Sequence, residues 1–215
     1  MTLLSRASGM ENSDLQMAHL RMVCEGLLFK IVQQSKDHNN GGFVVALTSP
    51  TPGSGVSHIT RALADSLRKG GGQFAISLDC WHLEYDSCDS ADPAIMAPGK
   101  SVNSFWEPRR SEGFLHDWHG TQETVVESLN KLRNKYRYIL IDCPSLKETP
   151  DALRLAPLVD GMVLVIEANR TQKEHILYAE RTLERARGRI LGHVLNKRTY
   201  VIPDWLSRRM EAVGL

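Results

Sequence analysis

Five short apolar runs alternate with helical stretches along this chain, and that alternation constrains its fold more than any other feature. Each run is rich in β-forming residues and carries apolar side chains on both faces, which is typical of strands buried in a parallel sheet. The runs are residues 43–49, 74–79, 138–142, 162–168 and 189–196. We therefore predict an α/β fold with a mainly parallel β-sheet and helices on both of its faces.

The stretches between and around these strands predict how the chain is divided. Apolar residues recur at helical spacing between residues 15 and 29, and a polar stretch follows them. We predict an N-terminal helical lead-in over residues 1–42, the α/β domain over 43–199 and a C-terminal helical tail over 200–215. Helices are expected within the domain over residues 121–136, 152–158 and 171–187. Residues 80–120 show no period, so we expect loops with one short helix there.

The charge balance limits the classes of partner. The 215 residues include 26 Lys and Arg against 25 Asp and Glu, and a net charge of +1 gives little attraction to nucleic acid. No apolar run approaches the roughly 18 residues of a membrane span, and the first residues lack the apolar segment of a signal peptide. We expect a cytoplasmic protein that neither inserts into a membrane nor binds nucleic acid.

The four cysteines are widely spaced and never form a C-x-x-C pair, which indicates reduced thiols rather than a disulfide framework. A zinc site is an alternative for the irregular stretch. Its ligands would come from Cys80, His82, Cys88, His116 and His119. Because their spacing matches no known zinc module, ordinary loop residues are the favoured interpretation.

A glycine-rich turn, SPTPGSGVS at residues 49–57, lies between the first predicted strand and a helical stretch; we call it the glycine turn. Glycines in such a turn let backbone N–H groups surround an anion, so a phosphate loop is the obvious hypothesis. The standard pattern is G-x-x-x-x-G-K-[ST], whose lysine reaches the β- and γ-phosphates. Gly55 and Ser57 fit this pattern, but Val56 occupies the lysine position. Taken alone, the turn fits a simple helix–strand connection equally well.

Two carboxylates strengthen the phosphate-site hypothesis. Asp79 and Asp142 each lie at the carboxyl end of a predicted strand, and open α/β sheets bind ligands at that edge. Both can serve one magnesium ion and its water. The alternative for each is a capping role in the turn that follows it.

Several segments together resemble the bacterial tyrosine kinases, the cytoplasmic kinase part of capsule and exopolysaccharide assembly systems. These segments are LTSPTPGSG, LDCW, YRYILIDCPSL, DALRLAPLVDGMVLVIEANRT and RILGHVLNK. The resemblance covers about residues 15–199 and implies a P-loop NTPase-like fold that uses ATP and Mg²⁺. In the family the three site motifs, called Walker A, A′ and B, read like SPxPGEGKS, IDADLR and IDTPP.

The resemblance also implies roles for individual residues. The phosphates would lie against Gly53, Ser54, Gly55, Val56 and Ser57, and His58 would be a further cofactor-binding residue. Magnesium would be held by Ser57, Asp79 and Asp142, and the two aspartates would be the catalytic carboxylates. Asn196 falls where relatives present an asparagine to the nucleotide base, although a turn residue at a strand end is the alternative interpretation.

Departures from the family pattern cluster around the expected phosphate. The lysine is Val56, His58 stands where threonine is usual, and the second aspartate of the A′ motif is Trp81. Loss of one charge-assisted hydrogen bond costs roughly 1.5–3 kcal/mol, so we predict weak or absent ATP binding and loss of fast phosphoryl transfer.

Two peripheral features of the family are also altered. The self-association motif E-x-x-R-x-x-R aligns with Ala18, Arg21 and Cys24, so only Arg21 remains, and no tyrosine lies in the last fifteen residues. The sequence therefore predicts a regulatory partner with eroded kinase function. Its binding partner would be the cytoplasmic tail of a membrane polysaccharide chain-length regulator, with self-association as a further expectation.

The sequence is also compatible with two alternatives. One is an active tyrosine kinase that takes its cation from Lys100, Arg109, Arg110 or a neighbouring subunit. The other is a relative of the partition or positioning ATPases, which act on DNA or membrane. The balanced charge weighs against the second alternative.

Overall fold

The computed structural model describes residues 22, 24–36, 41–69, 75–80 and 122–198. They form a five-stranded sheet in the order β2-β3-β1-β4-β5, in which every pair of neighbouring strands is parallel. The strands are β1 Phe43–Thr48, β2 Ala75–Asp79, β3 Tyr138–Asp142, β4 Gly161–Glu167 and β5 Ile190–Asn196. The predicted α/β fold class is confirmed.

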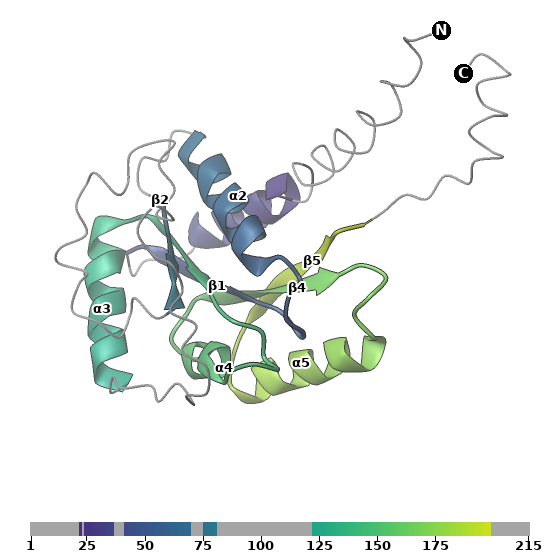
Figure 1. Cartoon of the computed structure of the whole chain (residues 1–215). Coiled ribbons are helices and arrows are strands. Elements are labelled where there is room, and N and C mark those ends of the chain that lie inside the picture. Colours follow the sequence, from purple (N-terminus) through teal and green to yellow (C-terminus); the bar gives the residue numbers. More distant parts are fainter. Residues whose placement is uncertain (1–21, 23, 37–40, 70–74, 81–121, 199–215) are drawn as a thin grey trace, which may run out of the picture.

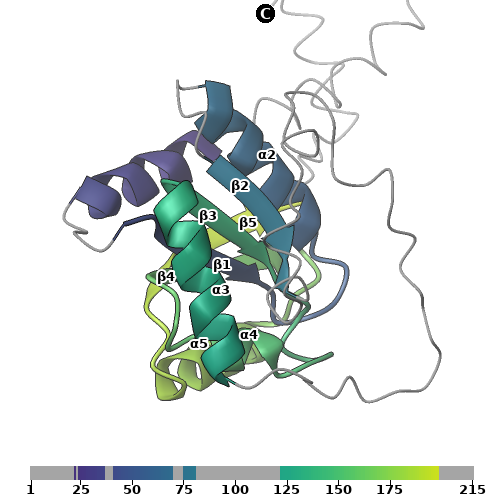
Figure 2. The same cartoon turned by 90° about the vertical axis from the view of Figure 1, so that its left-hand side faces the viewer.

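Helices cover both faces of this sheet (Figures 1 and 2). An N-terminal helix over residues 24–36 and helix α2, Val56–Lys69, cover one face. Helices α3 Gln122–Lys135, α4 Asp151–Leu155 and α5 Lys173–Arg185 cover the other face. In the central strands β1 and β4, successive side chains point to opposite faces of the sheet and are covered by helices on both. Every residue of these two strands is therefore buried.

The strand boundaries agree closely with the apolar runs, because a continuous apolar segment must be buried on both faces. The predicted helix over residues 171–187 is shorter at both ends as α5, and the other two predicted helices correspond to α3 and α4. Residues 1–21, 81–121 and 199–215 lie outside the described part of the chain. The predicted three-part division of the chain, the loops at 80–120 and the C-terminal helical tail therefore stay predictions.

The topology places a binding edge at the carboxyl end of β1. This central strand leads into α2 on one face, whereas its neighbours β3 and β4 lead into helices on the opposite face. Open α/β sheets bind ligands in the crevice that such a switch creates. Within the described residues, no helix is long and apolar enough to cross a membrane.

Candidate functional site

The glycine turn connects the end of β1 to the start of α2. Two of its residues, Gly53 and Gly55, have φ angles of 79° and 88°, in the left-handed region that favours glycine. Two serine hydroxyls donate hydrogen bonds to one carbonyl: Ser49 Oγ and Ser54 Oγ both lie 2.8 Å from the Thr51 oxygen. The turn is thus closed by its own side chains and presents glycine backbone directly before a helix N-terminus, an arrangement suited to an anion.

Val56, at the lysine position of the phosphate-loop pattern, belongs to the hydrophobic core. It is the first residue of α2, it is 8% exposed, and it lies in the same core cluster as Ile59 and Leu47. The residue therefore contributes apolar packing between α2 and the sheet, and it brings no charge to the turn.

The segment that follows β3 runs beside the beginning of the glycine turn. Thr48 Oγ1 donates a hydrogen bond to the Pro144 oxygen at 2.7 Å, and the Leu146 N–H donates one to the Ser49 oxygen at 2.9 Å. These bonds fix the exit of β3 against the exit of β1.

The two predicted carboxylate positions lie at this same edge. Asp142 is the register partner of Leu47 in β1 and also of Asp79 in β2, so the three strand ends are neighbours in the sheet. Asp142 is partly buried, and only the backbone position of Asp79 is described. The structure brings both residues to the edge that carries the glycine turn; their metal-binding and catalytic roles stay predictions.

The remaining predicted residues occupy different positions around the turn. Ser57 and His58 lie in the first turn of α2, where Ser57 is partly buried and His58 is exposed. The Asn196 side chain donates a hydrogen bond from Nδ2 to the Ser54 oxygen at 2.9 Å, and a Cβ placed on Gly55 would collide with that same amide group. Asn196 therefore ties the turn to the end of β5, whatever its relation to a nucleotide base.

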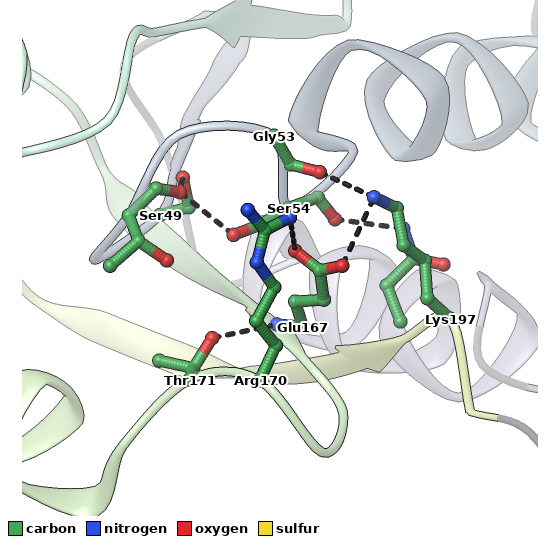
Figure 3. A network of polar contacts seen from close by, with 9 residues as sticks. Ser49, Gly53, Ser54, Glu167, Arg170, Thr171 and Lys197 are labelled. Carbon is green, nitrogen blue, oxygen red and sulfur yellow. Dashed lines mark hydrogen bonds and ion pairs between the residues drawn. The ribbon is translucent and has the colours of Figure 1, made fainter.

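Three charged residues at this edge were missed by the sequence analysis (Figure 3). Lys197 Nζ lies 2.6 Å from the Gly53 oxygen and 3.3 Å from Glu167 Oε1, and Arg170 Nη1 lies 3.3 Å from Glu167 Oε2. A signal for one of them was present, because Glu167 is the only charged residue in the apolar run 162–168 and ends β4. Like Asp79 and Asp142, Glu167 is a carboxylate at the carboxyl end of a strand, the edge where open α/β sheets bind ligands.

The residues at this edge include the types of group that would bind the nucleotide and the magnesium ion implied by the family resemblance. Hydroxyl and carboxylate oxygens at Ser57, Asp142 and Asp79 are the ligand types that Mg²⁺ takes. Backbone amides of a glycine-rich turn before a helix suit phosphate, and a side chain on Gly55 would displace the Asn196 amide that supports this turn.

Other predicted sites draw on residues outside the described part. Among the described residues, no group of three or more His, Cys, Asp or Glu side chains is arranged to hold a metal. Of the zinc candidates, Cys80 is described and buried, whereas the other four lie beyond the described ranges. Trp81 and the surrogate cations Lys100, Arg109 and Arg110 also lie outside them.

Curated relatives match a limited part of the chain. This chain is 41% identical over 68 residues to the putative tyrosine-protein kinase CapB of Staphylococcus aureus, and the matched segment covers 32% of this chain and 30% of CapB. It is 33% identical over 69 residues to the tyrosine-protein kinase CpsD of Streptococcus agalactiae, covering 32% and 30%. A third match, at 29% over 93 residues, is the succinoglycan biosynthesis transport protein ExoP of Rhizobium meliloti, covering 40% and 12%. The chain thus matches less than a third of each relative's length, and no protein-family model matches it.

Solved structures match over most of the chain. The VpsO kinase domain has a TM-score of 0.53 at 22% identity, covering 83% of this chain and 98% of that one. The kinase domain of the Escherichia coli tyrosine kinase ETK has a TM-score of 0.51 at 17% identity, covering 79% and 74%. The fold is therefore that of these kinase domains, and the predicted resemblance to bacterial tyrosine kinases is confirmed.

Proposed function

We propose that this chain is a phosphate-loop protein of capsule or exopolysaccharide assembly that acts as a regulatory partner. It binds Mg·ATP weakly or not at all and does not transfer the phosphoryl group quickly. The observation that supports this proposal is Val56, because the position that carries the catalytic lysine in the phosphate-loop pattern is here part of the apolar core.

The physical consequence follows from the charge on the transferred phosphoryl group. A loop lysine forms charge-assisted hydrogen bonds to the β- and γ-phosphates, each worth about 1.5–3 kcal/mol, and it stabilises the charge that spreads over the γ-phosphoryl oxygens in the transition state. Without the lysine, only the backbone amides of the glycine turn contact the phosphates, and they do not replace its positive charge. Nucleotide binding is therefore weakened or lost, and phosphoryl transfer loses its main electrostatic support.

The remaining parts of the site keep assigned roles within this proposal. Ser57, Asp142 and Asp79 hold Mg²⁺, which neutralises phosphate charge, and the amides of the glycine turn hold the phosphates. Asn196 supports the turn through its hydrogen bond to the Ser54 oxygen, and we assign it the contact with the nucleotide base that the family resemblance implies.

The partner we propose is the acidic cytoplasmic tail of a membrane chain-length regulator, which places the protein in the cytoplasm. Exposed basic residues on α5 and around β5 support this choice, since clustered guanidinium groups bind acidic segments. They are Arg181, Arg185, Arg187, Arg189, Lys197 and Arg198. Recovery of polysaccharide-assembly proteins with the tagged chain, in a salt-sensitive manner, is the expected result.

Calorimetry with Mg·ATP tests the proposal most sharply. Val56→Lys should bind about tenfold or more tightly than the natural chain, because it restores one charge-assisted contact. Val56→Met, similar in length but uncharged, is the matched control and should show no gain. Tight, magnesium-dependent binding by the natural chain would contradict the proposal.

The second candidate is an active ATP-dependent tyrosine kinase, and one observation favours it. Lys197 and Arg170 place two cations beside the glycine turn, where a substitute for the missing lysine would have to act. This candidate predicts phosphotyrosine formation in the presence of Mg·ATP.

A further inference from the structure

We propose that Lys197 and Arg170 supply the positive charge that the glycine turn lacks at Val56, so that the turn recognises the phosphate groups of an anionic ligand through side chains from the ends of β5 and β4. This inference rests on the proposed function, since it explains how a loop without its lysine retains weak nucleotide binding.

The two cations converge on the same residue of the turn. Lys197 Nζ lies 2.6 Å from the Gly53 oxygen, although the two residues are 144 positions apart in sequence. Arg170 Nη1 lies 3.9 Å from the point that a Cβ would occupy on Gly53. Figure 3 shows both side chains reaching the turn from the strand ends below it. Gly53 is exposed, so a ligand has access to this side of the turn.

The side chains beside the glycine turn carry a net positive charge that offsets the missing lysine charge at position 56. Lys197 and Arg170 contribute two positive charges and Glu167 one negative charge, which leaves one net positive charge beside the turn. This is the charge that a lysine at position 56 would have brought. The charge thus comes from the strand ends instead of from the first residue of α2.

Both cations have the freedom and the donors to reach a phosphate. Their side chains are 47% and 71% exposed for Lys197 and Arg170, so packing does not fix either head group. An ammonium group has three N–H donors and a guanidinium has five, so each side chain can contact Glu167 and a phosphate oxygen together. Arg170 is also suited to bidentate contact with phosphate.

Glu167 holds the two cations in place when no ligand is bound and competes with the ligand when one arrives. Its carboxylate is largely buried at the end of β4, and its backbone N–H donates a hydrogen bond to Thr171 Oγ1 at 3.2 Å. The largely buried carboxylate lies beside the turn, and its negative charge opposes an incoming phosphate. Removing that charge should strengthen anion binding.

Removing the charge of Glu167 should strengthen anion binding if the cluster recognises a ligand, but should not strengthen it if the cluster only maintains the shape of the turn. We would measure binding of Mg·ATP and of inorganic pyrophosphate by calorimetry at two salt concentrations. Lys197→Met and Arg170→Met should each weaken binding of both probes about tenfold and reduce its salt dependence. Glu167→Gln should strengthen binding by several-fold. Lys197→Arg should retain binding and remains informative if Lys197→Met does not fold.

Lys173→Met is the matched control, because it removes an exposed positive charge three residues beyond Arg170 in the first turn of α5. It should leave the affinity for both probes within about twofold. Weakened binding in Glu167→Gln would overturn the inference, because it would mean that the cluster only shapes the turn. Absence of binding of either probe by the natural chain at millimolar concentration would also overturn it. Neither result affects the proposed regulatory function, which fails instead if phosphotyrosine forms.

Discussion

The two ends of the parallel sheet each carry a cluster of charged side chains, but the clusters are built in opposite ways. At the amino edge, Arg133 and Asp160 form a bidentate pair with distances of 2.7 and 3.1 Å, and their side chains are only 14% and 13% exposed. At the carboxyl edge, Glu167 contacts Lys197 and Arg170 through single distances of 3.3 Å, and both cations are open to solvent.

The two clusters also differ in the parts of the backbone that they contact. Arg133 Nη1 also donates to the Gly42 oxygen at 2.7 Å, and Asp160 Oδ2 also accepts from the Val44 N–H at 2.7 Å. Those contacts fix the backbone at the start of β1. The carboxyl-edge cluster instead contacts the glycine turn at Gly53, which is exposed to solvent. The difference indicates that the first cluster maintains the fold and that the second is free to exchange partners for a ligand.

The largest effect on stability should come from breaking the amino-edge pair. Arg133→Ala leaves the largely buried Asp160 carboxylate without its bidentate partner, and we expect a loss of about 3–5 kcal/mol in the free energy of unfolding. Urea unfolding measures this loss. Lys135→Ala, an exposed residue at the end of the same helix, should change stability by less than about 0.5 kcal/mol. A loss below about 1 kcal/mol for Arg133→Ala would remove the distinction between the two edges.

An intermediate effect is expected inside the glycine turn. Gly55→Ala forces a side chain into the left-handed backbone region and against the amide of Asn196, and we expect a cost of about 1–3 kcal/mol. Gly53→Ala has a similar φ, but its Cβ would make only an ordinary contact with Arg170 Nη1 at 3.9 Å, so its cost should be only about 1 kcal/mol. Thermal unfolding of the two variants isolates the contact with Asn196. Equal losses would show that this contact is unimportant.

The smallest effect should come from the carboxyl-edge lysine. Lys197→Met breaks an exposed ion pair, so we expect the free energy of unfolding to change by about 0.5 kcal/mol or less, even though anion binding weakens. Urea unfolding alongside Arg133→Ala gives the direct contrast. A loss as large as that of Arg133→Ala would mean that both edges serve mainly to hold the fold.

The strands and the glycine turn could be predicted because their signals are local. A continuous apolar run must be buried on both faces, and its last residue marks the carboxyl edge, which is how Asp142 was placed beside the turn. Lys197 gave no such signal, since its contact with Gly53 joins residues 144 positions apart. The Arg133–Asp160 pair was missed for the same reason: a helix end and a strand start meet only after the sheet has formed.

The packing of Val56 shows a second limit of sequence reasoning. The pattern G-x-x-x-x-G-K-[ST] identified the absent lysine, but only the structure shows that valine gains core contacts at that position. The substitution is therefore a stable feature of α2 packing as well as a loss at the phosphate site.

We propose that this kinase-like fold does not transfer phosphoryl groups quickly. The direct test is to incubate the purified chain with Mg·ATP and a tyrosine-containing polypeptide as acceptor, and to measure phosphotyrosine over time. We predict no accumulation above the level of Asp142→Asn, because no cation at position 56 stabilises the transferred group. Robust phosphotyrosine formation by the natural chain that disappears in Asp142→Asn would contradict the account and show that the glycine turn is catalytic.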